Sequence, residues 1–257
     1  MQASNRGVEA MEQADFARAE EFFGQALQLR PDDADARFYL GVIALRGQRP
    51  AVAVPHLRAS ALVDATRPDV HLNLARALYD QKRPEEALTA LKTLFVLDPS
   101  HPNGHLLAAR IALDLGQRKV ADQALRAAIL GDPGFAPAYQ LLAQLYVDVG
   151  AFEAAREVLQ EGLRFTPDAV ELQEALGLCW LDLGKPERAK SVFAQAADHP
   201  RARPALFLNQ AAALLQLGER DGAMRALRAY LIQAQGQGDE ASVQAAAKVL
   251  IKLKSGK

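Results

Sequence analysis

Small and large apolar residues recur along this chain at a constant spacing of 34 residues. One column is always alanine, a second is always glycine or alanine, and a third is always leucine or phenylalanine. Their members are Ala19, Ala53, Ala87, Ala121, Ala155, Ala189 and Ala223; Gly7, Gly41, Ala75, Ala109, Ala143, Gly177 and Ala211; and Phe23, Leu57, Leu91, Leu125, Leu159, Phe193 and Leu227. A fixed period of this length predicts one supersecondary unit that stacks on copies of itself.

Each period contains two helical patterns with a short turn between them. Within residues 136–169, apolar residues recur at helical spacing until Gly150, and a second pattern begins at Phe152. Glycine at that position ends a helix readily because it accepts a left-handed backbone. The same stop glycine recurs as Gly116, Gly184 and Gly218. The sequence therefore predicts a helix–turn–helix unit in every period.

Proline marks the start of several second helices, at Pro50, Pro84 and Pro186. The first position of a helix tolerates proline because its missing N–H would be unpaired there in any case. Pro55 is different, because it lies inside a predicted second helix, where proline costs about 3 kcal/mol. We therefore expect a kink at Pro55, or a helix that starts late.

These units resemble the tetratricopeptide repeat. Residues 170–203 carry the match well, with Leu176-Gly177, Trp180, Ala189, Phe193, Ala196 and a nearby proline. The resemblance covers nearly the whole chain and implies an all-α fold, a right-handed superhelical solenoid. We divide residues 1–237 into seven repeats: 2–33, 34–67, 68–101, 102–135, 136–169, 170–203 and 204–237. Residues 238–257 are predicted to form a capping helix and tail, with the helix over 240–254, Asp239 as its N-cap and a turn at 235–238.

The small columns have a packing explanation. Glycine or alanine lets two antiparallel helices approach closely, and we expect the large column to fill the gap toward the next pair. A leucine in place of Ala121 should overpack the stack by about 1–3 kcal/mol.

Composition and charge exclude several classes of function. The net charge is −1 in 257 residues, so no overall field favours nucleic acid or an anionic membrane. The single cysteine, Cys179, excludes an intrachain disulfide and lies in a predicted packed helix. No run of 18 apolar residues occurs, so we expect no membrane span. We expect a cytoplasmic protein, or a periplasmic one if a leader has been removed.

One column of the first helices is acidic in four consecutive repeats: Asp80, Asp114, Asp148 and Asp182. A carboxylate in the last turn of a helix opposes the helix dipole, so helix propensity does not explain the column. One interpretation is an acidic stripe that binds a basic or amide-rich peptide. The other is local pairing, through Arg76–Asp80 and Arg110–Asp114, or through backbone N–H groups in the turn. Asp148 follows Gln144, and Asp182 has no cation four residues earlier.

A second cluster consists of Asn73, Arg76, Tyr79 and Arg110, and Asn209 occupies the same column as Asn73. In the repeat family that this chain resembles, asparagine in that column grips the backbone of a peptide, because an amide both donates and accepts. The alternative is an ordinary solvated helix face. Apolar groove walls are also predicted, at Phe38, Val42 and Leu45 and at Leu178 and Leu181, with inter-repeat packing as the alternative.

No residue pattern supports catalysis or a metal. His101 and His105 are four residues apart, but Pro102 and Gly104 place them across a turn, which makes a zinc site a weak prediction. No phosphate-binding glycine loop or nucleophile–base–acid arrangement fits the helical pattern. We expect no enzymatic activity and no cofactor.

The resemblance implies a non-enzymatic scaffold that binds a peptide or helix of a partner protein in its concave groove, with a bacterial secretion or pilus assembly complex as a setting. The alternative is a regulatory or targeting arm of a larger enzyme, such as a kinase or glycosyltransferase, whose catalytic domain lies outside this chain. The candidate partner-binding residues are Asn73, Arg76, Tyr79, Asp80, Arg110, Asp114, Gln144, Asp148, Asp182 and Asn209.

Overall fold

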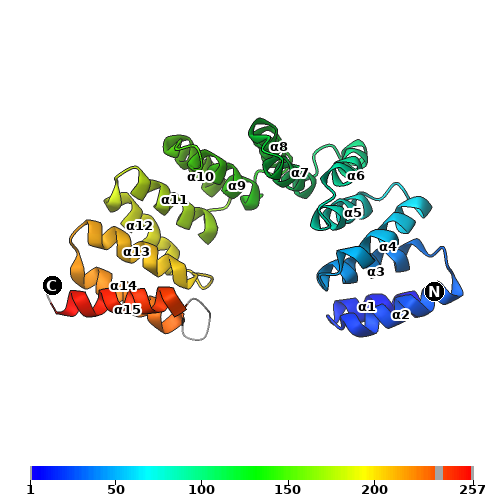
Figure 1. Cartoon of the computed structure of the whole chain (residues 1–257), viewed down its shortest axis with the longest axis horizontal. Helices are drawn as coiled ribbons and strands as arrows, with labels where there is room; N and C mark the ends of the chain where they lie inside the picture. Colours follow the sequence, from blue (N-terminus) through cyan, green and yellow to red (C-terminus); the bar gives the residue numbers. More distant parts are fainter. Residues whose placement is uncertain (1, 235–239, 256–257) are drawn as a thin grey trace. The chain divides into compact units, whose positions relative to one another are not determined.

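A computed structural model describes residues 2–234 and 240–255, and all regular structure in these ranges is α-helical (Figure 1). The chain divides into two compact units, residues 1–131 and 132–257. Unit 1 contains α1 (Gln2–Glu12), α2 (Phe16–Leu29), α3 (Ala34–Arg46), α4 (Pro50–Val63), α5 (Pro68–Asp80), α6 (Pro84–Leu97), α7 (Pro102–Asp114) and α8 (Arg118–Gly131). Unit 2 contains α9 (Ala136–Val147), α10 (Phe152–Phe165), α11 (Val170–Asp182), α12 (Pro186–Ala197), α13 (Pro204–Gln216), α14 (Arg220–Gln233) and α15 (Glu240–Lys254). The predicted all-α fold of paired helices is confirmed.

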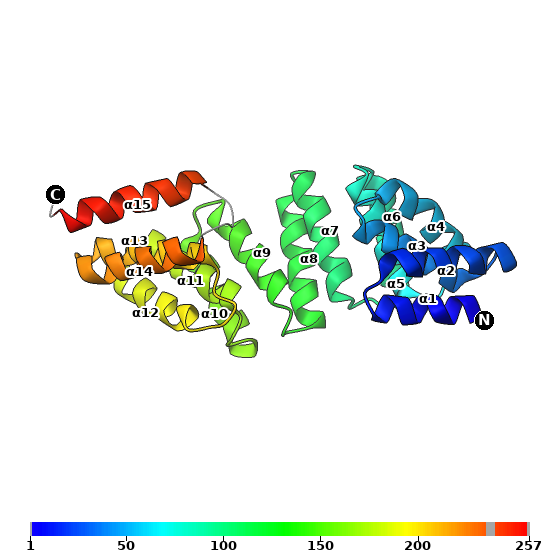
Figure 2. The same ribbon diagram turned by 90° about the horizontal axis from the view of Figure 1, so that it is seen from below.

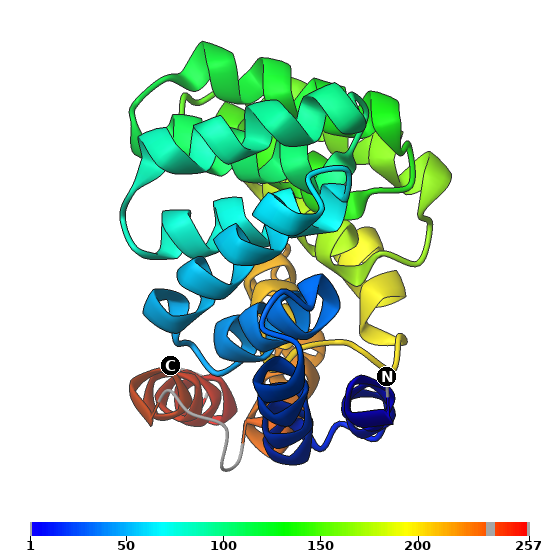
Figure 3. The same ribbon diagram turned by 90° about the vertical axis from the view of Figure 1, so that its right-hand side faces the viewer.

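Successive helices in each unit pack side by side, as the blue to green helices of unit 1 show in Figure 3. The small and large columns meet inside a helix pair. A Cβ atom on Gly7 would lie 2.7 Å from Cζ of Phe23, and one on Gly177 would lie 2.3 Å from Cε1 of Phe193. Both phenylalanine side chains are completely buried. The expectation about the large column is therefore corrected, because these side chains fill the space against the small residue of their own pair.

The turns inside the helix pairs share one backbone geometry. In each of the seven pairs, a residue two or three positions after the end of the first helix has a positive φ, between 54° and 74°. These residues are Ala14, Gln48, Lys82, Gly116, Gly150, Gly184 and Gly218. The next residue donates its N–H to the carbonyl five positions earlier, at 2.7–3.0 Å, which is the Schellman pattern. The four stop glycines are confirmed, and three other residues adopt the same conformation.

We expect Gln48→Gly to stabilise the protein. Gln48 has a φ of 54° and is exposed, so its side chain adds strain without packing. Relief of the left-handed penalty, less the extra entropy of glycine in the unfolded chain, should give about 0.5–1 kcal/mol. Urea unfolding measures this, and Gly116→Ala is the matched opposite change, expected to destabilise by a similar amount. If Gln48→Gly and Gly116→Ala changed the free energy of unfolding equally and in the same direction, strain at Gln48 would not be the cause.

Pro55 does not delay its helix. α4 runs from Pro50 to Val63 without interruption, with Pro55 inside it. The proline leaves the carbonyl of Ala51 without its helical partner, but both residues are exposed. Water can therefore replace the lost hydrogen bond, and the expected late start is wrong.

The predicted C-terminal helix is present as α15, which packs on α14 (Figure 2). Ala246 and Leu250 are buried, and Val243 and Leu253 are partly buried against the same apolar cluster. The predicted N-cap Asp239 and the turn at 235–238 lie outside the described residues.

Tyr139 of α9 carries a polar atom into the core of unit 2. Its side chain is completely buried, and its hydroxyl has no hydrogen-bond partner among the described residues. Burial, followed by the charges of Glu161 and Asp132, raises the pKa of the phenol. No protein group among the described residues therefore compensates the burial of this hydroxyl.

Tyr139→Phe should raise the free energy of unfolding by about 1 kcal/mol, because it removes an unpaired buried hydroxyl and keeps the ring. Thermal and urea unfolding measure the effect. Tyr79→Phe is the control, since the Tyr79 hydroxyl has a partner and its loss should be neutral or destabilising. A destabilised Tyr139→Phe variant would mean that the hydroxyl has a partner, such as bound water.

Candidate functional site

A pocket of about 280 Å³ lies in unit 2 between α9 and α11 and reaches the start of α13. Its apolar wall includes Ala143, Leu159 and Leu178, and Leu178 remains 40% exposed. The polar lining residues are Gln140, Gln144, Glu171, Glu174, Asp182 and Arg203. Both long walls come from first helices of their pairs, which are the helices where the sequence predicts a binding surface.

Glu174 is the buried acid of this pocket and is 6% exposed. Its Oε2 accepts a 2.5 Å hydrogen bond from Nη2 of Arg203, and its Oε1 accepts one of 3.1 Å from Nδ2 of Asn209. Arg203 is the N-cap residue of α13, so the next helix pair supplies the charge that neutralises Glu174. This arrangement satisfies the desolvated carboxylate and fixes the α11–α13 side of the pocket.

Neither Glu174 nor Arg203 was among the residues predicted from the sequence. A signal was available, because Glu174 is the only charged residue in its 34-residue column, whose other members are Ser4, Phe38, Leu72, Leu106, Gln140 and Leu208. Arg67, the N-cap residue of α5, makes the equivalent contact in unit 1. Its guanidinium lies 4.6 Å from the ring centre of Phe38, which occupies the same column as Glu174. An arginine at this position reaches back 29 residues in both cases.

The candidate residues of unit 2 are brought together around this pocket. Gln144 and Asp182 line it, and Nε2 of Gln144 donates to Oδ1 of Asp148 at 2.7 Å. Asp148 is the C-cap of α9, and Asp182 is the last residue of α11. Asn209 joins the group through its hydrogen bond to Glu174. Both aspartates therefore stand at helix ends, as predicted, where the dipole does not favour them.

The pocket is acidic overall. Arg203 is paired with Glu174, which leaves Glu171 and Asp182 on the lining and Asp148 beside it. Cys179 also lines the pocket but is buried, and burial, followed by the Asp182 charge, raises the pKa of its thiol to about 11. The thiol is therefore protonated and a poor nucleophile at neutral pH. The geometry suits a cationic side chain whose alkyl stem packs on the apolar wall.

The candidate residues of unit 1 form a smaller cluster across α5 and α7. The Tyr79 hydroxyl donates to Oδ2 of Asp114 at 2.6 Å. Burial, followed by this hydrogen bond, raises the pKa of Tyr79 to about 12, and the charges of Arg110 and Asp80 also act on it. Four of the predicted residues are thus neighbours.

Several details of the predicted cluster are corrected. Arg76 and Arg110 are exposed, and neither forms an ion pair with Asp80 or Asp114 within the described part of the chain. Tyr79, from the preceding helix pair, is the partner of Asp114 instead. Asn73 donates its side-chain N–H to the carbonyl of Asp69 in its own helix, at 2.8 Å. Helical side chains four apart can pair, but on an exposed face other partners compete with that geometry.

The apolar groove wall predicted in α3 is also wrong in part. Phe38 and Leu45 are buried in the core of unit 1, with Val42 packed against them. The alternative of inter-repeat packing holds for these residues, whereas Leu178 lines the pocket of unit 2.

The two candidate zinc ligands form hydrogen bonds with main-chain groups instead. His101 is the N-cap of α7 and its Nδ1 accepts from the N–H of Gly104, while Nε2 of His105 donates to the carbonyl of Pro99 at 2.8 Å. The described residues contain no group of three or more side chains suited to a metal ion. Within the same residues, no helix is long and apolar enough to cross a membrane.

Comparison with known proteins identifies the family to which these helix pairs belong. Two tetratricopeptide repeat models match the chain, one over residues 5–69 and the other over residues 44–111 and 112–179. The chain belongs to the tetratricopeptide repeat family. Tetratricopeptide repeats are in general non-catalytic modules of protein interaction, and this chain has a protein-interaction role. The division of the chain into seven repeats remains a proposal. A search of curated protein sequences found no match to this chain.

Solved tetratricopeptide repeat proteins share the fold. PilF of Pseudomonas aeruginosa is 25% identical, with a TM-score of 0.62 over 75% of this chain and 86% of its own. PilW, described as a widely conserved type IV pilus biogenesis factor, is 18% identical, with a TM-score of 0.67 over 82% of this chain and 96% of its own. YrrB, described as having an unusual peptide-binding site, is 18% identical, with a TM-score of 0.55 over 75% of this chain and 97% of its own.

Proposed function

We propose that this tetratricopeptide repeat chain binds a basic segment of a partner protein in the pocket between α9 and α11. The observation that carries the proposal is the combination of an apolar wall with carboxylates that no cation neutralises within the described residues. Asp182 and Glu171 line the pocket, while its one arginine is engaged by Glu174. A lysine or arginine of the partner would supply the missing charge.

The lining also offers groups for the main chain of a bound segment. Gln140 and Gln144 expose their amides on α9, four residues apart on one helix face. Nε2 of Gln144 is bound to Asp148, which leaves its carbonyl oxygen as an acceptor. An amide recognises a peptide group without reading its side chain. The acidic residues would thus select the partner, and the glutamines would hold its backbone.

We also propose a setting in a bacterial secretion or pilus assembly complex. The similarity to PilF and to the pilus biogenesis factor PilW supports this setting. Deletion of the gene in its source cell, followed by electron microscopy of surface pili and a secretion assay, tests it. Unchanged pili and secretion would contradict the setting while leaving the pocket proposal intact.

A photo-crosslinking residue at Leu178 tests the pocket itself. Leu178 lines the pocket and is 40% exposed, so the substitution should not disturb folding. We expect a crosslink to a partner segment that contains lysine or arginine, identified by mass spectrometry. The same residue at Ile232 of α14, which is 71% exposed, is the matched control. Identical crosslinks from both positions, or none from Leu178, would overturn the proposal.

A further inference from the structure

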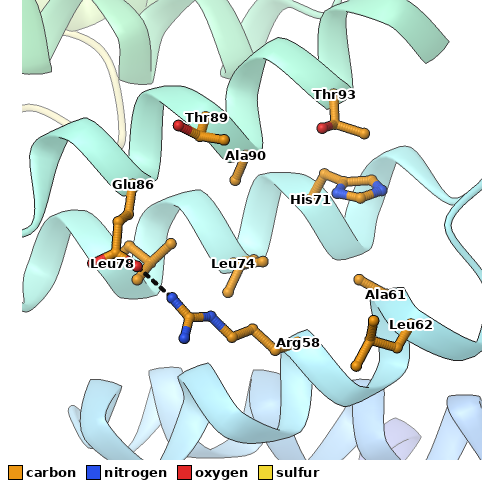
Figure 4. A pocket seen from close by; sticks show the side chains of 10 residues that line it. All are labelled: Arg58, Ala61, Leu62, His71, Leu74, Leu78, Glu86, Thr89, Ala90 and Thr93. Carbon is orange, nitrogen blue, oxygen red and sulfur yellow. Dashed lines mark hydrogen bonds and ion pairs between the residues drawn. The ribbon is translucent and has the colours of Figure 1, made fainter.

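A second pocket, of about 390 Å³, lies in unit 1 (Figure 4). The pocket of unit 2 has first helices of the pairs as its walls, whereas this one has second helices. Its walls are α4 and α6, the second helices of two successive pairs, and its floor is α5. Leu74 and Leu78 form the floor, and Ala61, Leu62 and Ala90 extend the apolar surface up the walls. The pocket contains none of the predicted binding residues, and the proposed function does not use it.

The polar groups around this pocket are mostly engaged. Nε2 of His71 donates to the carbonyl of Ala65 at 2.9 Å, and the hydroxyl of Thr89 donates to the carbonyl of Glu85 at 3.0 Å. Because the Ala65 carbonyl can only accept, Nε2 carries the proton, and Nδ1 is left as an acceptor. Nδ1 and the Thr93 hydroxyl are the lining side-chain groups without a partner among the described residues.

This shortage of hydrogen-bonding groups restricts what can occupy the pocket. An extended segment would bring in N–H and C=O groups that the apolar lining cannot satisfy, at a cost of about 1–3 kcal/mol for each buried group. A helix satisfies its own backbone and presents side chains only. The pocket therefore favours a helix over an extended peptide as its occupant.

The charge at one end of the pocket favours an acidic occupant. Arg58 and Arg83 both bind Glu86, with shortest N–O distances of 2.5 and 2.6 Å. The hydrogen bond from Arg83, supported by Arg58, lowers the pKa of Glu86. One carboxylate is thus shared by two guanidinium groups, so this cluster of three side chains carries a net charge of +1. A carboxylate of the occupant would complement Arg58, whose side chain is 45% exposed.

The apolar surface continues past the open end of the pocket. Leu62 lines the pocket and is 87% exposed, and Val96, one turn beyond Thr93 on α6, is 81% exposed. Apolar side chains on both walls therefore extend the trough along the helix direction.

We propose that the trough between α4 and α6 is a second docking site, which binds an amphipathic helix of a partner protein. Leucine-sized side chains of that helix enter the pocket over Leu74, and an acidic residue of the helix pairs with Arg58. This partner differs from the basic segment proposed for unit 2, so each site has its own ligand class.

Fluorescence anisotropy with a defined probe tests the proposal. The probe is a labelled peptide of roughly 18 residues, blocked at both ends, with leucines along one helical face and glutamates in its first turn. We expect saturable binding that Leu62→Asp and Thr93→Arg each weaken by about tenfold and Arg58→Gln by about threefold. Leu130→Asp is the matched control, since Leu130 is 85% exposed in the same column but outside the pocket, and it should leave the affinity unchanged.

Three results would overturn the proposal. The probe shows no saturable binding; a scrambled peptide without the leucine face binds equally well; or Leu130→Asp weakens binding as much as Leu62→Asp. Sedimentation analysis adds a fourth, because a concentration-dependent dimer that Leu62→Asp dissociates would identify a second copy of this chain as the occupant.

Discussion

Gly177→Ala should destabilise the protein by about 1–3 kcal/mol, against the usual benefit of replacing glycine inside a helix. The new Cβ would lie 2.3–2.7 Å from three carbons of the Phe193 ring, which is fully buried and cannot move aside freely. Gly24→Ala is the matched control. Gly24 is also helical, but an added Cβ has nothing within 4 Å, so this change should stabilise by about 0.5–1 kcal/mol.

The same site offers a rescue. Where the small column is alanine, as at Ala75, the large column holds leucine, as at Leu91, while Gly7 and Gly177 face phenylalanines. Adding Phe193→Leu to Gly177→Ala recreates the alanine–leucine pair and should recover most of the lost stability. Urea unfolding of both single variants and the double variant gives the coupling energy directly. Purely additive losses would mean that the two columns do not pack as a unit.

Asp148→Asn together with Asp182→Asn should weaken binding of a basic partner by about three- to tenfold, which is the usual range for two partly solvated charges. Helicity and melting temperature should remain nearly unchanged, since both side chains are exposed at helix ends. Wild-type binding should also weaken as salt rises, because the Debye length falls to about 3 Å at 1 M. Isothermal titration with the partner segment found by crosslinking measures each effect.

Asp168→Asn controls for net charge, because Asp168 is exposed in unit 2 but does not line the pocket. It should leave the affinity unchanged. If binding persists in the double variant and at high salt, the two aspartates have a structural role, and the acidic interpretation of the pocket fails.

The sequence was sufficient for the fold because packing sets the period. Helix ends follow from stop glycines such as Gly150 and from first-turn prolines such as Pro84, and the observed bounds agree with them. The left-handed conformation of Gln48 could not be read from its residue type, since glutamine has no preference for it. The turn geometry there is imposed by the helix pair, so tertiary packing overrides the local preference.

The candidate site was only partly predictable. Gln144 and Asp182 were predictable because the 34-residue register places both of them at surface positions. Glu174 was not predicted because its column is mainly apolar, and the member singled out there, Phe38, was interpreted as an apolar groove wall. An Arg110–Asp114 pair was one of the two interpretations of the acidic column, but Asp114 accepts its hydrogen bond from Tyr79, 35 positions earlier. The rotamer of a surface side chain depends on its neighbours in adjacent helix pairs. Those neighbours lie outside the 34 residues of a single period.

The helices that pack closely against one another lie one or two places apart in the order of the chain. Native structure can therefore form over short stretches of sequence, without waiting for distant segments to meet. During synthesis, each helix pair can therefore pack on the pair before it as soon as its own residues have left the ribosome. The protein would then emerge as a growing series of finished hairpins, with little time spent exposing unpaired apolar faces to chaperones or proteases.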